Sequence, residues 1–197
     1  MYQLNQPVNL LPRDGVVHLY EDFLAPDMAT QLMQCLTHEI NWVQREIVLF
    51  GKAVMQPRLM AWCGDRMYQY SGISLAPAEW HPTLFNLKQR IETCSGHQFN
   101  TALLNLYRDG QDSMGWHQDN EKVLGDEPVI ASLSLGAQRR FKFKHKFSKS
   151  MPVDVNLSHG SLLIMAGQTQ HQWLHSLPKS KIIKQPRINI TLRNVMY

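Results

Sequence analysis

The stretch RINITLR, residues 187–193, alternates polar and apolar side chains with a period of two. That is the period of a β-strand, whose successive side chains point to opposite faces. One face would carry Ile188, Ile190 and Leu192, and the other would carry Arg187, Asn189, Thr191 and Arg193. The apolar face predicts a hydrophobic core. The polar face, with two arginines about 20 Å apart along the strand, would either be exposed to solvent or face an anionic ligand.

Four further segments have the same period and are bounded by turn residues: FNTALLNLYR (99–108), VIASLSLG (129–136), RRFKFKHK (139–146) and GSLLIMAG (160–167). Short alternating strands in succession are typical of an antiparallel sandwich or a small barrel. The second half of the chain is therefore predicted to be a β-structure of this kind.

The first half has a different pattern. From Pro26 to about Ile40, apolar residues recur every fourth position at Met28, Leu32, Leu36 and Ile40, which predicts a helix lying on a core. A second helix is predicted over 81–96, with Pro82 in its first turn, Gly96 at its end, and a stripe made of Leu84, Leu87, Ile91 and Cys94. Residues 42–70 contain VLFGK and YQYSG and would supply a hairpin and loops over one end of the barrel.

The overall expectation is a mainly β fold with flanking helices (α+β), organised as one domain over residues 1–197. About residues 1–95 would form the helices and a lid, and about 96–197 the β-core. The length of 197 residues and the hydrophobic content of 44% suit a single core. The net charge of +4, from 20 Lys and Arg against 16 Asp and Glu, favours an anionic partner without the density of a basic tail.

Cellular location and assembly follow from weaker signals. The three cysteines are widely spaced and form no C-x-x-C pattern, which favours a reducing compartment over a disulfide framework. The N-terminal residues have no basic start, and no stretch of about 18 apolar residues occurs. We expect a cytoplasmic protein, or a nuclear one in a eukaryote, without a membrane partner and monomeric.

A second strand supports the ligand-facing interpretation of RINITLR. In FNTALLNLYR, alternation puts Asn105 and Tyr107 on one face and Leu104 and Leu106 on the other. Two arginines, an asparagine amide and a tyrosine hydroxyl together provide hydrogen-bond donors for two carboxylates. A dicarboxylate ligand is the chemistry that such a pocket would suit.

The stretch WHQDN, residues 116–120, adds a metal-binding pattern. On a strand, His117 and Asp119 would point to the same face and could share one ion, but two ligands hold a metal poorly. A third ligand could come from QTQHQWLHSLPK, which contains His171 and His175, and the residues alone leave both open. Two histidines and one carboxylate form the facial triad of non-haem Fe(II) oxygenases. His145 and His159 are expected at the surface or in turns.

These residues occur in a series of motifs that resembles the AlkB family of Fe(II)- and 2-oxoglutarate-dependent dioxygenases. The motifs run in order through most of the chain: VLFGK, PR, GD, YQYSG, NLYRDGQDSMGWHQDNE, IASLSLGAQRRFKFKHK, HGSLLIMAG, WLHSLPK and PRINITLR. The subgroup they most resemble is that of the animal homologues 2 and 3, which repair duplex DNA.

The resemblance implies a double-stranded β-helix, or jelly roll, with an N-terminal nucleotide-recognition lid. It places Fe(II) on His117, Asp119 and His175, with His171 exposed or behind the ligands. It assigns one end of 2-oxoglutarate to Asn105 and Arg193, and the far carboxylate to Tyr107 and Arg187 beside Thr191. The catalytic group would then be His117, Asp119, His175 and Arg193.

The activity implied is oxidative demethylation of 1-methyladenine and 3-methylcytosine in DNA, with O2 as the other cosubstrate and formaldehyde, succinate and CO2 as products. Methylated DNA, double- or single-stranded, would be the partner. The alternatives are an RNA demethylase of the same family and a nucleic-acid-binding jelly roll without catalysis.

The resemblance also implies which residues contact the nucleic acid. A hairpin tip made of Phe50, Gly51 and Lys52 would fill the gap left by a flipped base. The flipped base would stack on and be read by the segment Tyr68, Gln69 and Tyr70. Asn120 would face the substrate, where duplex-acting relatives often carry an acid, and this departure puts the base preference in doubt.

Overall fold

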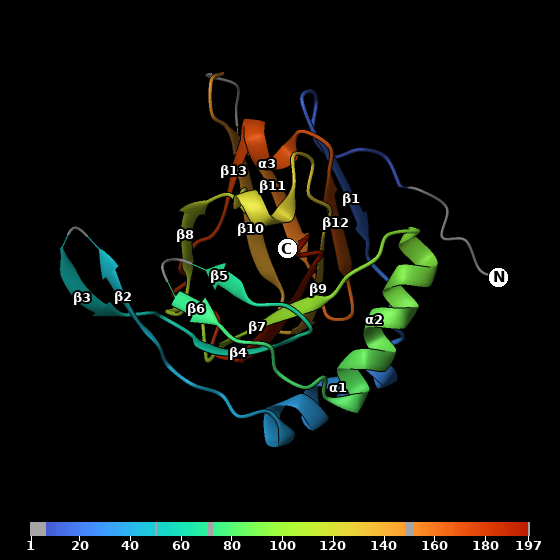
Figure 1. Cartoon of the computed structure of the whole chain (residues 1–197), viewed down its shortest axis with the longest axis vertical. Helices are drawn as coiled ribbons and strands as arrows, with labels where there is room; N and C mark the ends of the chain where they lie inside the picture. Colours follow the sequence, from blue (N-terminus) through green and yellow to red (C-terminus); the bar gives the residue numbers. More distant parts are fainter. Residues whose placement is uncertain (1–6, 50, 71–72, 149–151, 197) are drawn as a thin grey trace.

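Two antiparallel sheets form the body of the molecule (Figure 1). The computed structural model describes residues 7–49, 51–70, 73–148 and 152–196, and for 48–49, 68–70 and 73–75 it describes the backbone alone. The larger sheet has the order β1 (Val16–Tyr20), β12 (Leu162–Ala166), β9 (Ile130–Gly136), β14 (Arg187–Arg193), β7 (Thr101–Tyr107), β4 (Leu59–Gly64). The smaller sheet has the order β11 (Val153–Leu157), β10 (Arg139–His145), β13 (Trp173–Leu177), β8 (Met114–His117).

The two sheets face each other across an apolar layer, which makes the fold the expected jelly roll. From the larger sheet this layer takes Leu103, Ile130 and Leu163, and from the smaller sheet Phe143, Val155 and Trp173. Because side chains alternate along each strand, the larger sheet also has an opposite face. That face is apolar too, so another layer of the protein must cover it.

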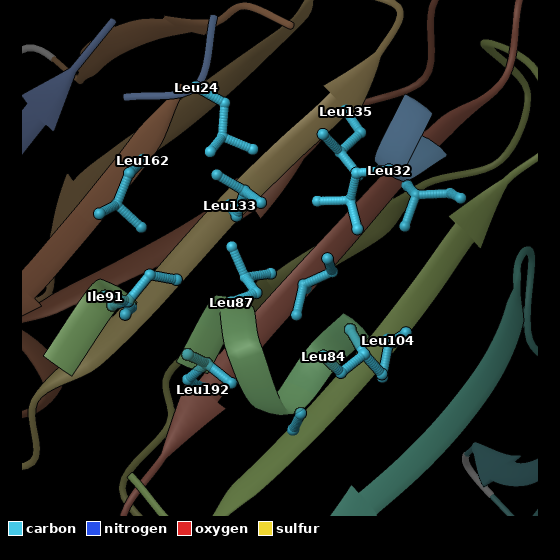
Figure 2. Close-up of a cluster of buried hydrophobic side chains, with 14 of the residues drawn as sticks. Leu24, Leu32, Leu84, Leu87, Ile91, Leu104, Leu133, Leu135, Leu162 and Leu192 are labelled. Carbon is cyan, nitrogen blue, oxygen red and sulfur yellow. The ribbon is translucent and has the colours of Figure 1, made fainter. Parts of the chain in front are cut away.

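Helices α1 (Pro26–Glu39) and α2 (Pro82–Ser95) cover that outer face. Figure 2 shows leucines of both helices against leucines of β7, β9 and β14. Pro82 is in the first turn of α2, and Gly96 ends it with φ of 73°, a left-handed conformation that glycine adopts without strain. The elements that remain are the single turn α3 (Thr169–Gln172) and the 3-10 turn η1 (Lys122–Leu124).

The predicted stripe of α1 is confirmed at Leu32 and Leu36 and wrong at Met28. Ala29, Leu32 and Leu36 are buried, whereas Met28 is 49% exposed. Spacings of three and four keep 29, 32 and 36 on one helical face, so Met28 lies at its side, where its sulfur accepts a hydrogen bond from Arg90 at 3.8 Å. In α2 the stripe of Leu84, Leu87 and Ile91 is buried as predicted, and Cys94 is half-buried.

The larger sheet takes two strands from the first 95 residues, which were expected to supply only helices and a lid. β1 pairs with β12 along the edge of the sheet, and β4 pairs with β7 along the other edge. Leu59–Gly64 was expected among the loops over the barrel end. Its backbone hydrogen bonds with β7 instead make it an edge strand, which satisfies polar groups that would otherwise be left unpaired.

Two short hairpins follow the lid prediction. One joins β2 (Glu46–Leu49) to β3 (Lys52–Met55), and the other joins β5 (Tyr68–Tyr70) to β6 (Ile73–Leu75). In Figure 1 the β2–β3 hairpin projects from the flank of the molecule opposite α2. Gly51 at its tip has φ of 76°, which suits glycine in a two-residue turn. Among the described residues, no helix has the length and hydropathy needed to cross a bilayer.

The expectation that His145 is a surface or turn residue is wrong. His145 is 6% exposed, packs edge-on against Trp173 and donates from Nε2 to Asp14 at 3.2 Å. The alternation of RRFKFKHK places it on the inner face of β10, next to Phe143. His159 lies after β11 and is partly exposed as expected, accepting the backbone N–H of Gly136 at 2.8 Å.

Candidate active site

Strand β14 is buried along its whole length, on both faces. Ile188, Ile190 and Leu192 pack under the helices. The polar face points toward a small cavity between the two sheets and is therefore not exposed to solvent. The cavity is lined by Leu103, Asn105, Tyr107, Met114, His117, Asp119, Ser132, Phe141, Met165, His175, Leu177, Arg187, Asn189, Thr191 and Arg193. Every residue that was expected to hold the metal or 2-oxoglutarate is in this set.

His117, Asp119 and His175 converge at one end of the cavity. The Nε2 atoms of the two histidines are 3.1 Å apart, and Asp119 Oδ1 is 4.0 Å from His117 Nε2. Neighbouring strands explain the convergence, since His175 on β13 pairs directly with His117 on β8. His171 lies on α3 with its ring at the carbonyl of Asp126, so of the two candidate histidines only His175 reaches the cluster.

The donor set fits a divalent ion. Two ligands bound at about 2.1 Å and at right angles lie about 3 Å apart, which is the separation of the two imidazole nitrogens. Within the described residues, the buried Asp119 Oδ1 has no hydrogen-bond partner, and a buried anionic oxygen without a partner is costly unless a cation binds it. Two histidines and one carboxylate would leave other coordination positions of an iron ion open for a cosubstrate.

The charges around the cluster keep its ligands in the forms that bind metal. Burial opposes ionisation of Asp119, but the positive charge of Arg193, followed by those of His175 and His117, outweighs it and holds the pKa of Asp119 at about 2. Burial, then repulsion from His117, lowers the pKa of His175 to about 3, and burial also lowers the pKa of His117. At neutral pH the carboxylate is therefore charged and both imidazoles are neutral.

Two neighbours orient the ligands. His117 Nδ1 donates to the carbonyl of Gly115 at 2.9 Å, which leaves Nε2 with a lone pair facing the cluster. The buried Gln170 accepts the backbone N–H of Asp119 at 3.0 Å through its side-chain oxygen. Sequence reasoning missed Gln170, because a glutamine in a turn carries no metal-ligand signal and its contact joins residues 51 positions apart.

Arg193 lies at the metal ligands, and Asn105 lines the same cavity next to Asn189 in the strand register. Arg193 donates to Asp119 Oδ2 at 2.8 Å in an ion pair whose side chains are each 3% exposed. Asn105 accepts from Arg58 Nε at 2.8 Å through Oδ1, so its amide Nδ2 is left to donate into the cavity. Arg58 belongs to the PR motif, and its role as the residue that orients Asn105 was not predicted.

The far end holds Tyr107 and Arg187. The guanidinium of Arg187 lies 5.4 Å from the centre of the Tyr107 ring, and its Nη2 donates to Ser134 Oγ at 2.8 Å. Its Nε is buried and has no partner among the described residues. Burial lowers the pKa of Arg187 to about 10, so it remains charged at neutral pH. Further along the same strand, Thr191 donates to Asn189 Oδ1 at 3.2 Å.

Of the expected nucleic-acid contacts, the described residues Gly51, Lys52 and Asn120 do not line this cavity. Phe50 and the side chains of Tyr68, Gln69 and Tyr70 lie outside the described residues. Gly51 and Lys52 are exposed at the hairpin tip, and Asn120 is exposed directly after the buried Asp119.

The lowered pKa of His175 predicts acid sensitivity in the metal-free protein. Between pH 6.5, the ordinary value, and about 3, the unfolded chain binds a proton on this side chain that the folded chain does not. Falling pH therefore favours unfolding, and the stability is fully present only above about pH 6.5. We expect urea titrations to show a loss on the order of 2 kcal/mol from this group at pH 5 relative to pH 7. His175→Asn should show a smaller loss, and an unchanged pH dependence in that variant would contradict the assignment.

Comparisons with known proteins agree with this geometry. The family model described as 2OG-Fe(II) oxygenase superfamily matches residues 16–193. The human protein named alpha-ketoglutarate-dependent dioxygenase alkB homolog 3 is 42% identical over 188 residues, which cover 91% of this chain and 66% of that protein. The human protein named DNA oxidative demethylase ALKBH2 is 37% identical over 180 residues, covering 85% of this chain and 69% of that protein.

A solved structure titled "The structure of OsALKBH1" superposes with a TM-score of 0.62 at 18% identity, covering 90% of this chain and 97% of that one, and it supports the fold. The chain spans just under two thirds of the length of the human and mouse alkB homolog 3 proteins. The match to the family model and the identity to these relatives show that the chain belongs to the 2OG-Fe(II) oxygenase superfamily, in the AlkB group that contains homologues 2 and 3.

Proposed function

We propose that this protein is an Fe(II)- and 2-oxoglutarate-dependent dioxygenase that removes N-methyl groups from 1-methyladenine and 3-methylcytosine in DNA. The observation that carries the proposal is the cavity in which a facial triad, with Asp119 and His175 buried and His117 partly exposed, and two arginines share one lining. The relatives named as dioxygenases and DNA oxidative demethylases support the choice of reaction and substrate.

The residues of the cavity would have distinct roles. His117, Asp119 and His175 would hold Fe(II), and Asn105 and Arg193 would bind the keto-acid end of 2-oxoglutarate. Arg187 and Tyr107 would bind its far carboxylate. The bound iron and 2-oxoglutarate supply the chemistry that activates O2 and hydroxylates the N-methyl group, after which formaldehyde leaves the base. The chain itself holds the cosubstrate in a fixed orientation and excludes bulk water from the buried ligands.

The pairing of Arg193 with Asp119 has a consequence for assembly of the site. In the absence of cosubstrate this arginine neutralises the metal-binding carboxylate across 2.8 Å. In the proposed site Arg193 would also bind the carboxylate of 2-oxoglutarate, so one cation would stabilise both anions that meet at the metal. Metal and 2-oxoglutarate should therefore bind cooperatively, each reducing the cost of the buried charges.

The projecting β2–β3 hairpin supports action on nucleic acid. Val54 and Met55 are exposed apolar side chains, 43% and 48% accessible, on a hairpin that also carries Lys52. Exposed apolar residues on a projecting hairpin that also carries a cation suit contact with stacked bases and a phosphate. Phe50 at the tip would be the wedge. Tyr68 and Tyr70 on the neighbouring hairpin would hold the flipped base, and Asn120 would face it.

Replacing His117 by Ala tests whether the protein is an enzyme or only a binding module. We expect the variant to release no measurable formaldehyde from methylated oligonucleotides, because two ligands hold iron poorly, while its affinity for DNA falls less than twofold. His171→Ala is the matched control, since His171 lies outside the cluster, and it should retain activity. Full formaldehyde release by His117→Ala would contradict the metal assignment.

Removing the aromatic side chain at the hairpin tip tests whether it acts as the wedge. A variant in which Phe50 is replaced by Ala should lose on the order of tenfold in activity on duplex DNA, because the gap left by the flipped base is no longer filled. Activity on single-stranded DNA should change little, because a base in a single strand leaves no gap inside a duplex. Repair rates on the same oligonucleotide, annealed and alone, make the comparison. Equal losses on both substrates would contradict the wedge.

Three finer points belong to the same proposal. Methylated RNA is the alternative substrate, and a matched RNA oligonucleotide in the same assays would detect it. We propose that the protein acts as a monomer, which sedimentation can test. We propose a cytoplasmic location, or a nuclear one in a eukaryote, on the basis of composition alone.

A further inference from the structure

A second buried arginine lies beside the far end of the cavity. Arg139 on β10 is 2% exposed, as is Arg187 on β14. The guanidinium of Arg139 is 5.8 Å and that of Arg187 is 5.4 Å from the ring centre of the same residue, Tyr107. Each of the two sheets thus contributes one cation next to the Tyr107 ring, at the end of the cavity away from the metal ligands.

Neutral groups provide all the hydrogen bonds of Arg139. Its guanidinium donates to three backbone carbonyls, those of Asp109 at 3.0 Å, Asp112 at 2.9 Å and Pro178 at 2.8 Å. The Asp112 carboxylate is paired instead with Arg108, at 2.8 Å. Within the described part of the chain, neither Arg139 nor Arg187 forms an ion pair with a carboxylate.

Two buried like charges that form no ion pair are costly, because each has lost its hydration and each repels the other. The burial of Arg139 lowers its pKa, and the carboxylates of Asp112 and Asp109 offset this only in part. Burial lowers the pKa of Arg187 most, Tyr107 raises it, and the charge of Arg139 lowers it further, so the two cations repel each other. The buried Nε of Arg187, which has no partner among the described residues, marks where an acceptor would bind. At Arg187 the far end of the cavity is therefore short of one negative charge.

We propose that Arg139 is a positioning residue for the cosubstrate: without touching it, its charge adds to that of Arg187 in attracting the far carboxylate, and so selects 2-oxo acids that carry a second carboxylate. This inference rests on the proposed function, which assigns Arg187 and Tyr107 to that carboxylate. Arg139 is separated from the cavity by Tyr107 and does not line it.

The size of the effect follows from the environment. A charge about 8–10 Å from another, at the effective dielectric constant of about 20 found in proteins, changes a binding constant by roughly 15- to 30-fold. The effect should apply only to ligands with a far carboxylate. Oxalate chelates a metal through two carboxylate oxygens and has no such group, so it serves as the comparison ligand.

The test compares dissociation constants of 2-oxoglutarate and oxalate, measured by calorimetry on the protein loaded with Mn(II), which does not turn over. Arg139→Gln should weaken the binding of 2-oxoglutarate roughly 15- to 30-fold and that of oxalate less than twofold. Arg139→Lys, which keeps the charge, should keep the ratio of the two constants near that of the natural chain. Arg108→Gln is the control, because it disturbs the same 108–112 turn without removing the buried cation.

Each outcome decides the proposal. Equal weakening of both ligands by Arg139→Gln would mean that the residue acts only through the carbonyls it holds, and unchanged binding of both would mean that its charge has no role. A changed ratio of the 2-oxoglutarate and oxalate dissociation constants in Arg139→Lys or in Arg108→Gln would overturn the proposal as well. Should Arg139→Gln fail to fold, Arg139→Met is measured in its place, and failure of both neutral variants would assign Arg139 to folding alone and overturn the proposal. If the natural chain binds no 2-oxoglutarate, the cosubstrate assignment itself fails, and that result is distinct from the others.

Discussion

Replacing Asp119 by Asn is expected to remove metal binding altogether while leaving the jelly roll folded but less stable. The amide has nearly the shape of the carboxylate but no charge, so it is a poor third ligand for a divalent ion. It also leaves Arg193 without its ion-pair partner in a site where both side chains are 3% exposed. Removing one partner of a buried ion pair costs about 3–5 kcal/mol.

The measurement is a pair of titrations, Mn(II) binding by calorimetry and unfolding by urea. Asp154→Asn is the matched control. Asp154 pairs with Arg140 and Lys142 at 3.5 and 3.6 Å, but at a more exposed position on the outside of the smaller sheet. Exposed pairs contribute about 0–1 kcal/mol, so this variant should bind metal as the natural chain does. Mn(II) binding of natural strength by Asp119→Asn would remove the carboxylate from the proposed site.

Replacing Arg187 by Met should separate stability from cosubstrate binding. Truncating one member of a buried, hydrogen-bonded charge pair costs about 2–5 kcal/mol, so the affinity for 2-oxoglutarate should fall by roughly 10²–10³-fold. The metal-free protein should be as stable as the natural chain or more stable, because a buried charge without a counter-ion is replaced by an apolar side chain of similar length. Residues kept for binding at a cost in stability are usual at functional sites.

Calorimetry with 2-oxoglutarate and urea unfolding in its absence make this comparison. Arg140→Met is the control, because Arg140 is an exposed cation on β10. This variant should leave the affinity for 2-oxoglutarate and the stability unchanged. A large loss of stability in metal-free Arg187→Met, with 2-oxoglutarate binding retained, would show a structural role and contradict the assignment.

Much of the fold could be predicted from sequence because its signals are local. Period-two alternation identified β7, β9, β10, β12 and β14, and period-four spacing with Pro82 and Gly96 identified the helices. Strands β1 and β4 were not identified. VVHLY and LMAWCG carry no clear alternation, and each is a strand only because a neighbour's edge offers backbone hydrogen bonds.

The candidate site could be predicted where residue type carries the chemistry. His117 and Asp119 are two positions apart, and the arginines of β14 share one strand face, so spacing alone grouped each set. The choice of His175 over His171 required the family resemblance, because a single turn of helix between Gly167 and Trp173 decides which ring faces the metal cluster.

Supporting residues could not be predicted. Arg58, Arg139 and Gln170 act by hydrogen bonds to groups 27 to 51 positions away in sequence, and a polar residue that will be buried cannot be told from an exposed one by type. His145 was misplaced for the same reason. Burial of such groups depends on sheet pairing, which is not a local property.

The central claim is oxidative demethylation at the buried His117–Asp119–His175 site, and mass spectrometry of methylated oligonucleotides tests it most directly. The protein would be incubated with Fe(II), 2-oxoglutarate and O2 and with single- and double-stranded DNA carrying 1-methyladenine or 3-methylcytosine. The account predicts a loss of 14 mass units from the methylated base, dependent on both Fe(II) and 2-oxoglutarate and absent in Asp119→Asn. Unchanged mass on every methylated substrate, from folded protein that binds metal, would contradict it.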